Sequence, residues 1–94
     1  MSYILDGQTP VHEPDIVKWA LWLESTGDER VVAFDMIDTN EWVSTCFIGH
    51  DPRHSEPPCV FETLVEGGKL NGHTQRYPSW AAALEGHRNL VDSL

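Results

Sequence analysis

Two stretches of the chain carry apolar residues at helical spacing. In the first stretch they recur every three or four positions, at Ile16, Trp19, Ala20 and Leu23. This spacing predicts an amphipathic helix that Gly27 ends, because glycine readily adopts the left-handed C-cap conformation. The second stretch follows Ser79, a favourable N-cap, and aligns along one side Trp80, Ala83, Leu84, His87 and Val91. Within this second helix, Gly86 is expected to permit close packing against another element.

Alternating apolar and polar residues predict four strands. The expected strands are Tyr3–Leu5, Arg30–Ile37, Trp42–Ile48 and Cys59–Glu66. A polar hairpin turn over residues 38–41 joins the second and third strands, and a loop over residues 49–58 leads to the fourth. The order β-α-β-β-β-α predicts a single α+β domain over residues 1–94, an antiparallel sheet with two helices packed on one face. The opposite face of such a sheet stays open, which favours a homodimer.

The charge balance narrows the range of partners. Fifteen acidic residues oppose six basic ones, which gives a formal charge of −9. Such a surface repels phosphate backbones and anionic lipids, so direct nucleic-acid binding and membrane binding are not expected. The N-terminus does not resemble a signal peptide, and the longest apolar run, Trp19–Leu23, is too short to span a bilayer. We therefore expect a cytoplasmic protein.

The acidity is concentrated around the predicted hairpin. Six acidic residues and one base lie between positions 24 and 41, the acids being Glu24, Asp28, Glu29, Asp35, Asp38 and Glu41. Spaced carboxylates of this kind can imitate phosphates towards a basic or nucleic-acid-binding protein. Trp42 follows directly and is a candidate aromatic anchor for a partner. The simpler interpretation is that the acidic side chains only keep the protein in solution.

Four residues in and around the loop are candidate zinc ligands. They are spaced Cys-x3-His-x3-His-x4-Cys and comprise Cys46, His50, His54 and Cys59. These are ligand types that tetrahedral zinc prefers, although Pro52 works against a helix that would align the two histidines. The alternative is two free cysteines in the core and two solvated histidines in the loop. No cofactor other than zinc is expected.

Other residues that can carry chemistry lack a supporting pattern. No signature surrounds either cysteine as a nucleophile, and no nucleophile elbow or phosphate-binding loop is present, so an enzyme is not expected. His87 is interpreted either as a ligand or switch, or more simply as a packed histidine with one hydrogen bond. Trp22 lies off the main apolar stripe of the first helix and is expected either to be partly exposed or to cover an edge.

Four segments of the chain resemble, as a set, a group of small proteins encoded by tailed phages. The segments are ILDGQTPVHEPD…KWALWLE, VSTCFIGHD, PPCVFETLVEGG and RYPSWAAALEGH. The resemblance covers nearly the whole chain, and FETLVEGG and YPSWAAALEGH are its most specific parts. It implies a phage or prophage origin and a bacterial host cell, but no particular activity. The loop 49–58 departs from the group, which is more often glycine-rich there.

These observations together predict a non-enzymatic, phage-type accessory protein that binds a host protein. The sharpest form of this hypothesis is an acidic inhibitor of a host defence system. Two alternatives stay open. The first is a metal-binding module built on the cysteines and histidines of the loop, and the second is a homo-oligomeric structural accessory that uses the open face of the sheet.

Overall fold

The computed structural model describes all 94 residues. The elements follow the order β1 (Tyr3–Asp6), β2 (Thr9–His12), α1 (Ile16–Ser25), the short 3-10 helix η1 (Asp28–Arg30), β3 (Val31–Asp38), β4 (Glu41–Phe47), β5 (Phe61–Glu66), β6 (Thr74–Tyr77) and α2 (Trp80–Ser93). They form a two-stranded sheet β1-β2 and a four-stranded sheet β3-β4-β5-β6, with every strand pair antiparallel. The predicted α+β class is confirmed.

The structure adds two strands to the predicted order. Strand β2 contains Pro10, which lacks a backbone N–H and hides the strand pattern in the sequence. Strand β6 consists of Thr74, Gln75, Arg76 and Tyr77, and only the last of these is buried. A mostly polar edge strand shows no apolar alternation, so hydrophobic periodicity alone does not reveal it.

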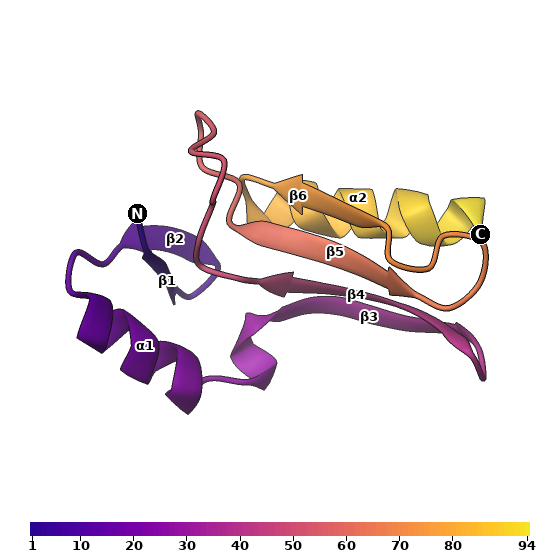
Figure 1. The fold of residues 1–94 in the computed structure, drawn as a ribbon, viewed down its shortest axis with the longest axis horizontal. Coiled ribbons are helices and arrows are strands. Elements are labelled where there is room, and N and C mark those ends of the chain that lie inside the picture. The colour runs from indigo at the N-terminus through magenta and orange to yellow at the C-terminus, as the bar shows by residue number, and fades with distance from the viewer.

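The two helices occupy different places. Helix α2 lies across one face of the four-stranded sheet and contacts all four of its strands, whereas α1 packs against β1 beyond the end of that sheet (Figure 1). Neither helix has the length and apolar character needed to cross a membrane. The single predicted layer of helices is thus divided between the two sheets.

Helix α2 covers the buried face of the sheet. Alternate residues of β4 and β5 point towards it and pair directly across the strands, as Val43 with Val65, Thr45 with Thr63 and Phe47 with Phe61. Phe47 and Phe61 meet edge to face with ring centroids 5.2 Å apart. Gly86 of α2 lies directly against the Tyr77 ring of β6, where a Cβ atom would clash. The predicted close packing at this glycine is confirmed.

Helix α1 is anchored through its indole side chains. Asp15 caps its N-terminus by accepting hydrogen bonds from the backbone N–H groups of Val17 and Lys18. The Trp19 Nε1–H donates to the carbonyl of Tyr3 at 3.0 Å, and Trp22 stacks edge to face on Phe47. Trp22 is therefore half-buried against the core and fixes which side of α1 faces inward.

Candidate protein-binding surface

The face of the sheet opposite α2 carries exposed apolar side chains. The strand register places Phe34 beside Ser44, which pairs with Leu64 on its other side, and Met36 beside Trp42. Phe34 is 55% exposed and Met36 is 62% exposed, so no other element covers them. Both belong to β3, which pairs with β4 on one side only and leaves its other edge free.

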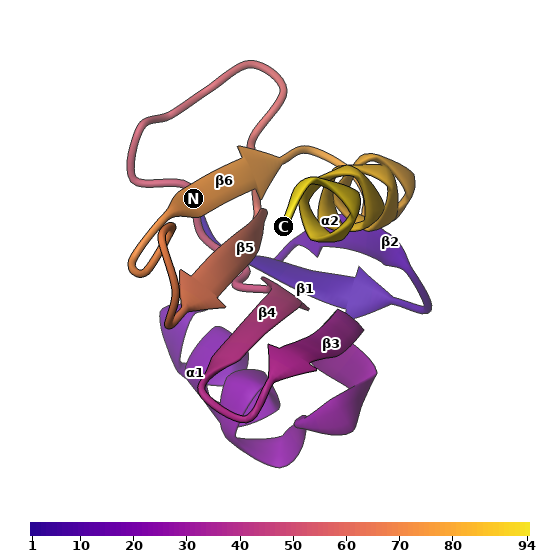
Figure 2. The same cartoon turned by 90° about the vertical axis from the view of Figure 1, so that its right-hand side faces the viewer.

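Helix α1 also presents apolar side chains to solvent. Of nine large hydrophobic residues that are exposed, six lie on α1 and β3, namely Ile16, Val17, Leu21, Val31, Phe34 and Met36. These six residues define the α1–β3 surface. The two elements lie on the same side of the molecule, the lower side in both Figure 1 and Figure 2. Clustered exposed apolar residues of this kind mark interaction sites in proteins.

The acidic residues predicted for partner binding fall on the same part of the chain. Glu24, Asp28, Glu29 and Asp38 are exposed, and Asp35 is half-exposed at its side chain. The carboxylate of Glu29 accepts a hydrogen bond from the backbone N–H of Gly27, and this bond lowers the pKa of Glu29 below its usual value. Carboxylates thus accompany the apolar side chains along α1, η1 and β3.

Two of the predicted partner-binding residues are less accessible than the others. Glu41 lies opposite Asp38 at the end of the β3-β4 hairpin, and its carboxylate rests against Gly68. Trp42 is half-buried on the open face of the sheet, between Met36 and Glu66 in the strand register. Trp42 therefore contributes to the floor of the open face, and the more exposed Phe34 and Met36 are better placed as anchors.

Asp35 has a structural partner that the sequence does not reveal. Its carboxylate lies 2.7 Å from Nε2 of His87, and the other ring nitrogen lies 2.7 Å from the hydroxyl of Thr45, which in turn bonds Thr63. Because an ionised carboxylate only accepts, Nε2 of His87 donates to it. Nδ1 shares the next hydrogen bond with the hydroxyl of Thr45, and the hydroxyls of Thr45 and Thr63 share the last.

The order carboxylate, imidazole and hydroxyl matches that of a nucleophilic triad. Here, however, Thr45 and Thr63 are fully buried, and no cavity is lined by either of them or by His87. A substrate has no path to the hydroxyl of Thr45. The chain of hydrogen bonds instead ties α2 to β3, β4 and β5, and His87 is a packed histidine with two partners where the sequence predicted one.

The four predicted zinc ligands are not brought together. No group of three or more histidine, cysteine, aspartate and glutamate side chains has the arrangement of a metal site. Cys46 lies half-buried on the open face of the sheet, where burial raises the pKa of its thiol. His50 pairs its backbone with Ser2, and His54 lies exposed on the loop. Both cysteines are free thiols, as predicted.

Asp51, rather than a metal, organises the loop between β4 and β5. Its buried carboxylate accepts hydrogen bonds from the backbone N–H groups of Arg53, Ser55 and Cys59 at 2.9 to 3.0 Å. The Cys59 N–H contributes most to holding the pKa of Asp51 well below its usual range, against the opposing effect of burial. The pair Asp51-Pro52 is the signal by which this loop could have been recognised, since aspartate readily accepts from backbone N–H groups within turns.

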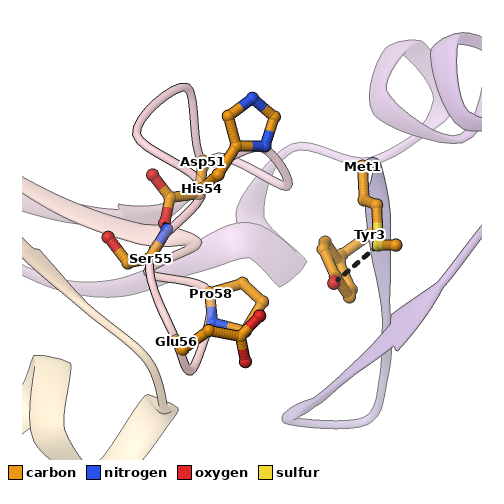
Figure 3. A pocket seen from close by; sticks show the side chains of 7 residues that line it. All are labelled: Met1, Tyr3, Asp51, His54, Ser55, Glu56 and Pro58. Carbon is orange, nitrogen blue, oxygen red and sulfur yellow. Dashed lines mark hydrogen bonds between the residues drawn. The ribbon is translucent and has the colours of Figure 1, made fainter.

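A small cavity lies between this loop and the N-terminus of the chain. It has a volume of about 120 Å³ and is lined by Met1, Tyr3, Asp51, His54, Ser55, Glu56 and Pro58 (Figure 3). The hydroxyl of Tyr3 lies 3.5 Å from the Met1 sulfur. The carboxylate of Asp51 is already occupied by the loop backbone, so the cavity offers few free groups that converge on one ligand.

Comparison of the chain with protein-family models, with curated proteins and with solved structures finds no match. The resemblance to small tailed-phage proteins therefore stays a prediction from the sequence. The function is therefore inferred from the α1–β3 surface.

Proposed function

We propose that the protein is a non-enzymatic binding protein that docks a basic protein partner on its α1–β3 surface. One observation carries this proposal, namely that six of the nine exposed large hydrophobic residues lie on the same stretch as most of the predicted partner-binding carboxylates. Apolar side chains at the centre of an interface supply affinity, and charges around them steer and orient the partner. The formal charge of −9 favours a partner of opposite charge.

In its finer form, the proposal is that this is a phage-type accessory protein acting in the cytoplasm of a bacterial host. The partner is then a host protein that binds nucleic acid, such as a component of a defence system. Glu24, Asp28 and Asp38 are exposed carboxylates and would take the place of phosphates in its binding site. Such a partner cannot hold the protein and its nucleic acid at the same time.

The experiment is a capture from bacterial lysate with three immobilised proteins. They are the wild type, the double variant F34S/M36S, and the control V11S, which removes an exposed valine of β2 outside the α1–β3 surface. We expect the wild type and V11S to retain the same basic protein, and F34S/M36S to lose it. Added salt should weaken capture, because exposed charges are screened within about 10 Å at 0.1 M.

Two results would contradict the proposal. The first is equal capture by F34S/M36S and the wild type. The second is a captured protein that is not basic and is retained at high salt. The finer form is tested separately by adding duplex DNA to the purified complex, since a nucleic-acid mimic must be displaced by DNA and an ordinary binding partner is not.

A homodimeric accessory is the second candidate, and the free edge of β3 favours it. This strand has eight residues and only one neighbour, so a second copy has an open edge along which to pair. Against it stands the charge of −9 on each copy, which opposes self-association. Light scattering of the purified protein decides the question, and a strictly monomeric mass at high concentration excludes the dimer.

A further inference from the structure

We propose a second binding site, for a phosphate dianion, in the cleft between the loop that follows β4 and strand β6. The cleft has a volume of about 230 Å³ and is lined by Arg53, Ser55, Cys59, Thr74, Gln75 and Arg76. This is below the roughly 300–1,000 Å³ of sites that hold drug-sized ligands. The ligand is accordingly small, either free phosphate or the phosphate group of a small monoester.

The composition of the cleft differs from that of the rest of the molecule. The chain has fifteen acidic residues and six basic ones, yet no carboxylate lines the cleft and two of the six bases do. The side chains of Ser55 and Thr74 add hydroxyl donors. Guanidinium and hydroxyl groups are the usual protein partners of phosphate oxygens. A concentration of donors in a strongly acidic protein indicates an anion as ligand.

Arg76 is held in place by its neighbours. Its Nη2 lies 3.0 Å from the carboxylate of Glu62, directly across from it on β5, and its Nη1 donates to the carbonyl of His50 at 3.4 Å. Glu62 offsets part of the charge of Arg76. The guanidinium of Arg53 makes no hydrogen bond or ion pair, so it supplies the net positive charge of the cleft.

Asp51 gives the loop side of the cleft its shape. Three of the six lining residues, Arg53, Ser55 and Cys59, are the same three whose backbone N–H groups bind the Asp51 carboxylate. That carboxylate is buried and does not itself line the cleft. The loop therefore presents Arg53 and Ser55 to the strand from a fixed backbone, and a ligand need not order the loop to bind.

The test is a titration of the ¹⁵N-labelled protein with inorganic phosphate, followed by amide chemical shifts. We expect saturable shifts confined to residues 53–59 and 74–76. Arg53→Gln should weaken binding about tenfold or more, because it removes a charge-assisted hydrogen bond. Arg88→Gln removes an exposed base of α2 that lies outside the cleft, and it should leave binding unchanged. Arg53 is exposed, so its substitution does not threaten the fold.

The site is excluded if phosphate gives no saturable shifts, or if Arg53→Gln and Arg88→Gln weaken binding equally. A second titration with O-phosphoserine distinguishes the two sources of the ligand, since the tighter of the two binders identifies free phosphate or a monoester. The double variant F34S/M36S should bind phosphate as the wild type does. Failure of this site and failure of the proposed partner surface are thus separate results.

Discussion

The two faces of the four-stranded sheet differ in how deeply they bury the same type of residue. On the face covered by α2, Phe61 is completely buried, whereas on the open face Phe34 is 55% exposed. The covered face is closed by a helix of 14 residues that contacts all four strands, and the open face has no such partner. An apolar side chain on a strand therefore indicates that a face is to be covered, but not that this chain itself provides the cover.

Helix α1 likewise has one covered side and one uncovered apolar side. Its inward side carries Trp19 and Trp22, yet Ile16, Val17 and Leu21 on its outward side are each about 60% exposed. A helix that is apolar on both sides is normally covered on both sides. The open face of the sheet and the outward side of α1 thus both lack a covering element. We assign them to one binding surface for this reason.

The strongest test of this difference is a pair of matched substitutions. Phe61→Ala should lower the free energy of unfolding by about 3–5 kcal/mol, because it leaves a cavity in a closed core. Phe34→Ala should change it by less than about 0.5 kcal/mol, because the side chain is mostly in water already. Urea denaturation of both variants gives the two values. Similar losses in both would mean that the open face is covered in solution.

The hydrogen bonds of His87 should contribute the next largest effect. His87→Ala removes one of the two hydrogen-bond partners of Thr45 and opens space under α2, so we expect a loss of about 2–4 kcal/mol. Asp35→Asn keeps the shape of the partner but removes its charge, and a smaller loss should result. Thermal unfolding of the two variants provides the comparison. If His87→Ala were as stable as the wild type, the hydrogen-bonded chain would not be what holds α2 on the sheet.

Gly86 tests how closely α2 approaches the sheet. Gly86→Ala gains helix propensity of about 1 kcal/mol but places a methyl group against the Tyr77 ring. Since Tyr77 is buried, its ring has little room to move, and we expect a net loss of about 1–2 kcal/mol. Gly27→Ala, where a Cβ atom meets nothing, is the control. A gain in stability for Gly86→Ala would show that the helix can shift away.

The smallest effect is expected at the loop, away from both faces. The folded-state pKa of Asp51 lies below the unfolded value of about 3.9, so its contribution to stability is present above that pH and is lost as the pH falls below it. Asp51→Asn should be less stable at pH 7, and its stability should change less between pH 5 and pH 3. Asp92→Asn at the exposed end of α2 is the control. If the stability of Asp51→Asn and of the wild type fell equally between pH 5 and pH 3, Asp51 would not have this role.

Much of the fold could be predicted from hydrophobic periodicity. The strands expected at residues 30–37, 42–48 and 59–66 correspond to β3, β4 and β5, and both helices were placed correctly. Strands β2 and β6 were missed because the first contains proline and the second is mostly polar. The inward side of α1 was only partly predicted, because Trp22 lies off the predicted stripe and packs on the core, whereas Ile16 and Ala20 of that stripe are exposed.

The candidate site was less accessible to sequence reasoning. The acidic stretch was predicted, and most of its side chains are exposed. What the sequence does not contain is the pairing of distant residues, such as His87 with Asp35, which are 52 positions apart. The zinc prediction relied instead on residues that are close together in the sequence. Cys46 and His54 are near in sequence, but strand β4 directs one to a sheet face and the Asp51-centred loop directs the other to solvent.

The free edge of β3 also makes the protein liable to aggregate, because an unpaired strand edge can pair with the same edge of another copy. Its sequence, VVAFDMID, is rich in β-forming apolar residues and is interrupted only by Asp35 and Asp38. Negative charges on an exposed edge act as gatekeepers against cross-β assembly, because stacked copies would place like charges in register. Replacing both aspartates with asparagine removes these charges, so fibril formation by the variant should be faster than by the wild type.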